Sequence, residues 1–196
     1  MSKSDPASQK KERSKSIRWV VTIFISTIII SGIISLASEE IMSVSAMPVA
    51  FVILLIIIFI GILFDIIGVA VTSADEKPFH SMAARKVPGA LEAIRLLRNA
   101  EKVGSICNDV IGDICGVVSG SASATIAAQV LQNFEFTWPR LASLLMSALV
   151  AGLTVGGKAV GKGIAIHSCT EIVHFVGRVI RNFQSIPRLF KRENMK

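Results

Sequence analysis

The stretch Val-Ala-Phe-Val-Ile-Leu-Leu-Ile-Ile-Ile-Phe-Ile-Gly-Ile-Leu-Phe occupies residues 49–64 and contains no charged side chain. A helix that crosses about 30 Å of hydrocarbon needs roughly 20 mostly apolar residues, because each residue advances it by about 1.5 Å. With its flanking residues, this stretch forms an apolar segment over 48–72 that only Asp65 interrupts with a charge. The segment therefore predicts a transmembrane helix.

Three further apolar segments, at about 19–37, 103–131 and 141–166, are also close to the length of a membrane span. The chain has 196 residues, of which 52% are hydrophobic and only 18% charged, which is too apolar for a soluble domain of this size. The four segments use most of the chain and leave no room for a second folded domain. We therefore predict an all-α integral membrane protein with four transmembrane helices in one membrane domain, residues 17–170.

The basic residues predict the orientation of these spans. The formal net charge is +7, and nearly all Lys and Arg lie in residues 1–16, 75–102 and 171–196. Loops rich in Lys and Arg stay in the cytoplasm. This pattern predicts a multi-pass protein of the cell membrane with both termini cytoplasmic. It also favours anionic lipids over nucleic acid as the partner of the basic segments.

Outside the spans we expect one disordered segment and two amphipathic ones. Residues 1–16 are polar and charged without periodicity, which is typical of a disordered tail. Within 78–100, apolar Leu91, Ile94 and Leu97 alternate with arginines at helical spacing, which predicts a helix on the inner membrane surface. Residues 171–196 form a basic amphipathic tail.

The second, third and fourth spans contain polar and charged residues whose exposure to lipid would cost free energy. A charge in hydrocarbon costs at least about 2.5–3.5 kcal/mol on insertion scales, so such residues should face protein or water. Carboxylate and amide oxygens are the ligands that Mg²⁺ and other hard cations prefer. The candidate metal ligands are Asp65, Asn108, Asp109 and Asp113.

Two interpretations of these charges remain open. In the first, the acidic residues line a pathway for ions or protons. In the second, they neutralise Lys158 and Lys162, which lie one helical turn apart in the fourth span, and nothing is transported. In either case we expect Asp65, Asp109 and Asp113 to converge within reach of Lys158.

The glycines of the third span form a repeated GxxxG pattern at Gly112, Gly116 and Gly120. Such spacing places small residues on one helix face and lets a second helix approach closely. The fourth span has small residues at similar spacing, at Ala148, Gly152 and Gly156. We therefore expect these two helices to pack closely through their small residues.

Nothing in the sequence predicts an enzyme or a resident cofactor. No nucleophile triad, phosphate-binding loop or paired-carboxylate pattern is present. The three cysteines, Cys107, Cys115 and Cys169, lie in apolar segments without CxxC spacing, which argues against a disulfide framework or a zinc site. A cation would be cargo rather than a cofactor.

Parts of residues 59–103 and 156–171 resemble the membrane domain of the cyclin-M/CorC family of magnesium transport proteins, without its CBS domains. The family pattern Phe-Phe-Ser-Gly-x-Glu-x-Ala-Leu-x-Ser compares with Leu-Phe-Asp-Ile-Ile-Gly-Val-Ala-Val-Thr-Ser at 63–73. The family's cytoplasmic turn compares with Lys-Val-Pro-Gly-Ala-Leu at residues 86–91. The family pattern Gly-Asn-x-x-x-Asn compares with Asn-Asp-Val-Ile-Gly-Asp at residues 108–113. Its Gly-Glu-x-x-Pro-Lys compares with Gly-Lys-Ala-Val-Gly-Lys at 157–162. The resemblance covers about 110 residues and implies a dimer.

This sequence departs from the family pattern at the positions that would line an ion site. The family's Ser and Glu correspond to Asp65 and Gly68, and its paired Asn to Asp109 and Asp113; a family Glu corresponds to Lys158. The resemblance implies divalent-cation transport or homeostasis, with Mg²⁺ or Co²⁺ as cargo, in a homodimer. The alternative is a non-transporting scaffold or partner subunit of the same fold with an internal Asp–Lys network.

Overall fold

The computed structural model describes residues 6–133 and 138–193, and all regular structure in this part of the chain is helical. Four helical segments are long and apolar enough to cross a membrane: Ile17–Ile41, Met47–Ser73, Ala100–Gln132 and Pro139–His167. The prediction of an all-α chain with four candidate spans is therefore confirmed. The orientation of these spans in a membrane stays a prediction.

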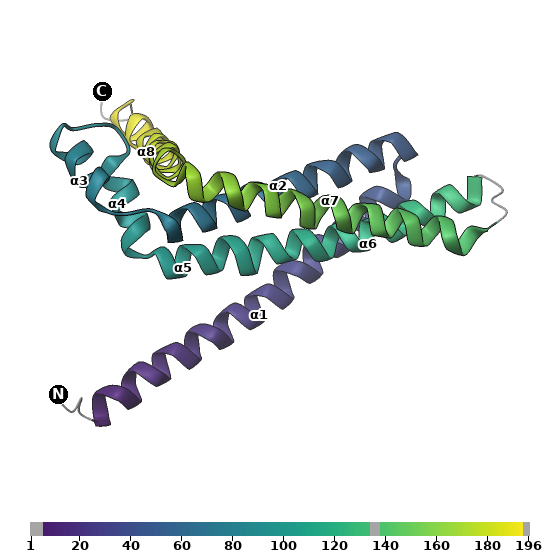
Figure 1. Ribbon diagram of the computed structural model, residues 1–196, viewed down its shortest axis with the longest axis horizontal. Helices are drawn as coiled ribbons and strands as arrows, with labels where there is room; N and C mark the ends of the chain where they lie inside the picture. Colours follow the sequence, from purple (N-terminus) through teal and green to yellow (C-terminus); the bar gives the residue numbers. More distant parts are fainter. Residues whose placement is uncertain (1–5, 134–137, 194–196) are drawn as a thin grey trace.

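Three of the long helices pack against one another and the fourth lies across them (Figure 1). Helix α2 spans Met47–Ser73, α6 spans Asp113–Asn133 and α7 spans Pro139–His167, and each of the three contacts the other two. Helix α1, Pro6–Val44, packs mainly against α6, and its first half extends away from the bundle (Figure 1). The start of α1 and the end of α7 lie at the same end of the bundle, as an even number of spans requires.

The first helix begins earlier than the sequence predicts. Residues 6–16 belong to α1, although they were expected to be disordered, and residues 1–5 lie outside the described residues. The segment contains Lys, Arg, Glu and Gln, which are good helix formers. Adding residues to an existing helix is far easier than nucleating one, so the apolar span extends backwards into the charged segment.

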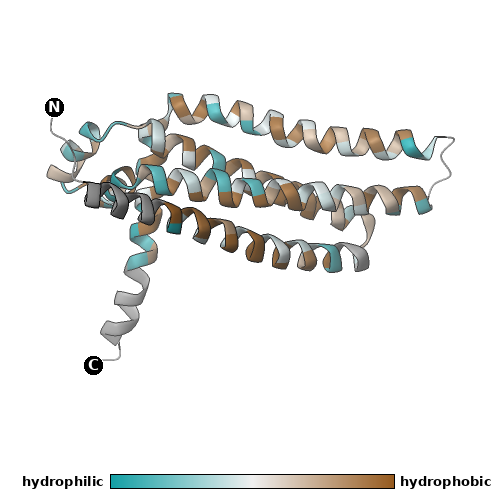
Figure 2. Cartoon of the chain, turned by 90° about the horizontal axis from the view of Figure 1, so that it is seen from below, coloured by the Kyte–Doolittle hydropathy of each residue, from teal (hydrophilic) through white to brown (hydrophobic). Residues whose placement is uncertain are grey.

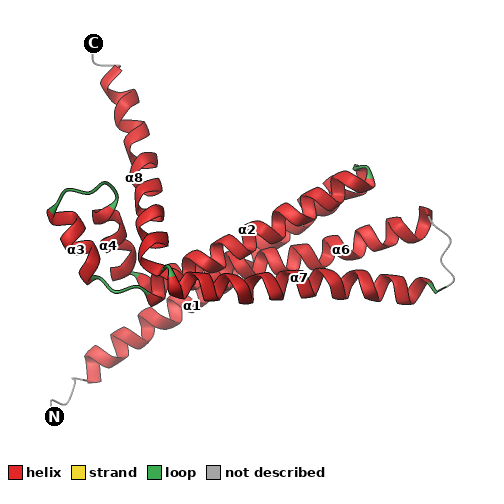
Figure 3. Ribbon diagram, turned by 45° about the horizontal axis from the view of Figure 1, so that its top comes forward, coloured by secondary structure: helices red, strands yellow, loops and turns green. Residues whose placement is uncertain are grey.

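Short helices form a cap at the end of the bundle where α2 finishes (Figure 1). Helices α3, Lys77–Ala84, and α4, Ala90–Arg98, replace the single helix expected over 78–100. Pro88 and Gly89 separate them, and Gly89 has a left-handed backbone with φ 89°. Helix α8, Cys169–Glu193, contains most of the predicted tail and leaves the bundle at a steep angle (Figure 3).

The buried side chains form two separate clusters. One lies at the capped end, where α3, α4 and α8 cover the last turns of α2 and α7, and Phe79 is its largest fully buried side chain. The other joins Ala50, Leu54 and Ile58 of α2 to Ala122 and Ile126 of α6. Hydrophobic residues otherwise run along the long helices, and many are exposed, as expected for lipid-facing surfaces (Figure 2).

The third span is not one regular helix. It begins as α5, Ala100–Ser105, continues as a π-helical segment η1, Ile106–Gly112, and becomes α6 at Asp113. A π-helix bonds each residue to the fifth residue along, and such segments within α-helices occur often at functional sites. This irregular stretch contains Asn108 and Asp109 and ends directly before Asp113.

Candidate functional site

Asn108 projects from η1 toward α2, where Gly68 makes room for it. A Cβ atom placed on Gly68 would overlap Oδ1 of Asn108 and lie 2.7 Å from its Cγ. The Asn108 Oδ1 atom is buried and has no hydrogen-bond partner. A buried acceptor without a donor costs about 1–3 kcal/mol. Among the described residues, Asn108 is the one with a buried side-chain oxygen or nitrogen left unsatisfied in this way.

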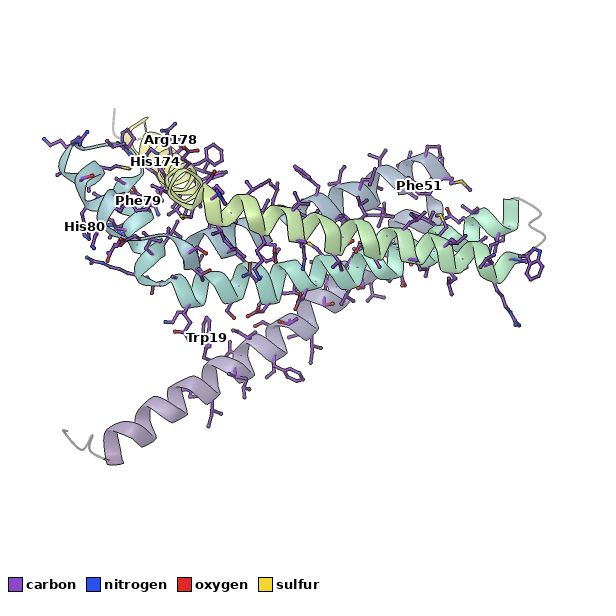
Figure 4. All side chains as sticks on the ribbon, viewed as in Figure 1. Trp19, Phe51, Phe79, His80, His174 and Arg178 are labelled. Carbon is purple, nitrogen blue, oxygen red and sulfur yellow. The ribbon has the colours of Figure 1, made fainter. Side chains whose placement is uncertain are left out.

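A cavity of about 700 Å³ opens beside Asn108 at the capped end of the bundle. Its lining comes from α1, α2, α5 and η1, so it forms where the first span meets the irregular start of the third. The side chain of Trp19 points from α1 toward this region (Figure 4), and the Lys102 Nζ atom lies 5.6 Å from the centre of its ring. The lining residues are Trp19, Thr72, Glu101, Lys102, Gly104, Ser105, Asn108 and Asp109.

Oxygen atoms are concentrated on one wall of this cavity. Ser105 Oγ donates a hydrogen bond of 2.8 Å to Oδ2 of Asp109, which orients the carboxylate. Thr72 Oγ1 lies on the facing helix and donates to backbone carbonyls of its own helix, at 3.0 Å from both Gly68 O and Val69 O. The wall therefore combines the Asp109 carboxylate with the hydroxyl groups of Ser105 and Thr72, and the Asn108 amide oxygen lies buried behind it, against Gly68.

A second polar cluster surrounds Gly112, at the junction of η1 and α6. Lys158 Nζ reaches across from α7 and donates a hydrogen bond of 3.2 Å to the Gly112 carbonyl oxygen. The same ammonium lies 3.7 Å from Oδ1 of Asp113. A Cβ on Gly112 would lie 3.4 Å from Lys158 Nζ and 3.9 Å from Asp65 Oδ1, so both charged groups converge on this glycine.

The structure thus divides the candidate ligands between two places. Asp65 and Asp113 accompany Lys158 around Gly112, whereas Asn108 and Asp109 line the cavity. Asp109 lies within η1 and Asp113 begins α6, and their carboxylates have different partners: Ser105 for Asp109 and Lys158 for Asp113. The convergence of Asp109 with Asp65 and Asp113 on one site stays a prediction.

Two further expectations concern the lysines of α7 and the binding of a metal ion. The proximity of Asp65 and Asp113 to Lys158 agrees with the sequence prediction, while Lys162 is exposed on α7. Within residues 6–133 and 138–193, no three His, Cys, Asp or Glu side chains come together to hold a metal ion.

The expected close packing of glycines between the third and fourth spans is not observed. Gly116, Gly120, Gly152 and Gly156 have no atom within 4 Å of the position of a Cβ. Between α6 and α7 lies a cavity of about 340 Å³ lined by Gly116, Gly120, Ser119 and Ser123, with Lys158 at its edge. The glycines of α7 that do make close contact, Gly157 and Gly161, receive Ile62 and Ile66 of α2 instead.

Comparison of the chain with protein-family models, curated proteins and solved structures finds no match. The resemblance to the cyclin-M/CorC family therefore stays a prediction, and the function has to be argued from the site itself. Thr72, Ser105 and Lys102 line the cavity but were not among the site residues predicted from the sequence. The available signal was the pair Gly68 and Gly104, which lets α5 approach α2 so closely that a Cβ on Gly104 would lie 2.7 Å from Thr72 Cγ2.

Proposed function

We propose that this chain is a membrane transport protein for small cations, of the divalent class, Mg²⁺ or Co²⁺, that the family resemblance implies. The observation that carries the proposal is the buried, unsatisfied Oδ1 of Asn108 beside a cavity that also contains the Asp109 carboxylate. An acceptor without a donor is stabilised when a cation, or water bound to a cation, approaches it. The site lies in a candidate span, where burial of an ionisable side chain costs free energy and such residues are usually functional.

The chemistry of the cavity suits a hydrated cation. Mg²⁺ gives up its water reluctantly and is usually bound through one or two carboxylates with several waters retained. The Asp109 carboxylate and the hydroxyls of Ser105 and Thr72 would provide such a partial shell in about 700 Å³, and the buried Asn108 oxygen would join it after a side-chain rotation. Lys102 lies over Trp19 and balances part of the negative charge at the mouth.

A second candidate function rests on the other cluster. Lys158 lies 3.7 Å from Asp113 and close to the Gly112 carbonyl, where it acts as a resident counter-ion. Such a network supports a non-transporting scaffold or partner subunit, because a fixed lysine competes with a mobile cation. The homodimer that the resemblance implies belongs to both candidates and remains a prediction.

Ion flux in proteoliposomes distinguishes the two candidates. Purified protein is reconstituted, and uptake of Mg²⁺, Co²⁺, Na⁺ and H⁺ is measured with dyes trapped inside. We expect divalent-cation flux in the native protein and a loss of at least about 10-fold in Asp109→Asn, which removes the charge but keeps the shape of the cavity wall.

Asp75→Asn is the matched control, since Asp75 is exposed in a loop away from the cavity and accepts a hydrogen bond from the backbone of Lys77. It should transport like the native protein, and both variants should have the native melting temperature. Flux no greater than that of protein-free liposomes would support the scaffold instead.

A further inference from the structure

Helix α8 follows α7 after a single residue, Ser168, and turns sharply away from the bundle (Figure 3). The spans run along the membrane normal, so a helix that leaves them at a steep angle runs close to the membrane plane. Its first turns lie at the end of the fourth span, at the level where hydrocarbon gives way to headgroups. One face of α8 is therefore expected to meet the membrane and the other to face water.

One face of α8 is covered by α4. Val173 is fully buried, and Gly177 packs so closely that an added Cβ would lie 2.5 Å from Gly89 O and 3.0 Å from Ala93 N. His174 Nε2 lies 3.1 Å from Pro88 O. Figures 1 and 3 both place α4 on the side of α8 that points away from the spans, and Figure 4 shows His174 and Arg178 on this side.

The opposite face of α8 is apolar and uncovered. Phe175 is 64% exposed, Val179 36% and Phe183 69%, and they recur every four residues along the helix. At 100° per residue this row lies on the far side of the helix from Val173 and Gly177, so it faces the side of the spans. Ile172, at the start of the row, packs against the buried cluster at the end of the bundle.

The charged side chains of α8 are also separated from its apolar face. Arg178 and Arg181 are exposed and lie away from the aromatic row, and in the described part of α8 no acidic residue follows Glu171 before Gln184. Arginines beside an embedded apolar row lie at the depth of lipid phosphates, where they attract anionic headgroups. Two phenylalanines on a free helix face would otherwise be left in water.

We propose that the Phe175–Val179–Phe183 face of α8 is embedded in the membrane leaflet at the capped end of the bundle, with the arginines at anionic headgroups. Helix α4 then covers α8 from the aqueous side, and lipid covers it from the other. The inference is independent of cation transport, since it requires only that the four spans cross the membrane.

Fluorescence of single tryptophans in the full chain tests this arrangement. Trp19→Phe and Trp138→Phe remove the native tryptophans, and Phe183→Trp or Gln184→Trp adds one on the apolar or the polar side of the same turn. The proteins are reconstituted in phosphatidylcholine vesicles containing phosphatidylglycerol. We expect brominated lipid to quench Phe183→Trp at least about twofold more than Gln184→Trp, and aqueous acrylamide to give the reverse order.

The anionic preference has its own measurement. At equal mole fraction, brominated phosphatidylglycerol should quench Phe183→Trp more than brominated phosphatidylcholine does, because the arginines enrich it around α8. Equal quenching by the two lipids would overturn the headgroup assignment. Equal acrylamide quenching of the two tryptophans would place the face in water, and protection of Phe183→Trp from both quenchers would place a protein against it; either result overturns the proposal.

Discussion

At the scale of single residues, glycines determine where polar side chains can lie inside the spans. Gly68 makes room for Asn108, and Gly112 lets Lys158 and Asp65 approach the backbone of the third span. At Gly68 an added Cβ would overlap the Asn108 amide oxygen, whereas at Gly112 it would lie 3.4 Å from Lys158 Nζ and 3.9 Å from Asp65 Oδ1. The same glycines viewed only as a helix-packing pattern suggest close contact between α6 and α7, which the structure does not have at Gly116 and Gly120.

The pairing of Lys158 with Asp113 has a measurable cost when one partner is removed. Lys158 is only 24% exposed, and Asp113→Asn leaves its ammonium with the Gly112 carbonyl and with Asp65 as the nearby carboxylate. We expect Asp113→Asn to lower the free energy of unfolding by up to about 1 kcal/mol, because Asp113 is 70% exposed and solvent weakens such an ion pair. Unfolding by sodium dodecyl sulfate in mixed micelles, followed by circular dichroism, measures the change.

Two variants complete this measurement. Adding Lys158→Met to Asp113→Asn should recover part of the loss, since the ammonium is then removed and Asp65 is the charge left around Gly112. Lys162→Met, one turn further along α7 and exposed, should change stability by less than about 0.5 kcal/mol. A double variant less stable than Asp113→Asn alone would show that the two charges do not compensate each other.

At the scale of elements, the contact between α4 and α8 depends on backbone meeting backbone. Gly89 has φ 89°, and an added Cβ there would lie 2.5 Å from the backbone nitrogen of Arg178 and 2.7 Å from its Cα. Gly177 approaches Gly89 from the other helix in the same way. The two glycines thus determine the distance between α4 and α8, and with it the position of the apolar face of α8.

Substitution of Gly89 should separate these two helices. We expect Gly89→Ala to destabilise the protein by about 2–4 kcal/mol, because alanine is strained at this backbone angle and its methyl group meets main-chain atoms that cannot move alone. The free energy of unfolding in mixed micelles gives the change.

Gly163→Ala provides the comparison for this prediction. Gly163 lies in α7 with no atom within 4 Å of an added Cβ, and alanine favours a helix by about 0.5–1 kcal/mol over glycine. This variant should be as stable as the native protein or more so. Equal losses in both variants would mean that the effect does not come from the α4–α8 contact.

At the scale of the whole molecule, the arrangement of the four long helices places the cap and α8 at one end of the bundle. The turn between α1 and α2 and the start of α7 lie at the other end (Figure 1). The Lys and Arg residues concentrate at the capped end, and loops with this composition stay in the cytoplasm. The cavity beside Asn108 would then open toward the cytoplasm.

Labelling from outside intact cells tests this orientation. In a background with Cys107, Cys115 and Cys169 replaced by serine, we expect Arg140→Cys to react with a membrane-impermeant maleimide. Arg85→Cys, exposed in the cap, should react only after the membrane is permeabilised. The reverse pattern would invert the topology, and reaction of both positions in sealed cells would be incompatible with four spans.

The amino-acid sequence by itself determined the all-helical class of this protein and the four segments long and apolar enough to span a membrane. Both follow from apolar length, which depends on local composition because hydrocarbon admits only helices whose backbone bonds are satisfied internally. Only the tertiary structure decided where the polar residues of the spans lie. Asp109 lines a cavity between α1, α2, α5 and η1, and Lys158 reaches Gly112 from a helix 46 residues away in the chain. Neither can be obtained from spacing along one helix, because both depend on how α2, η1 and α7 pack together.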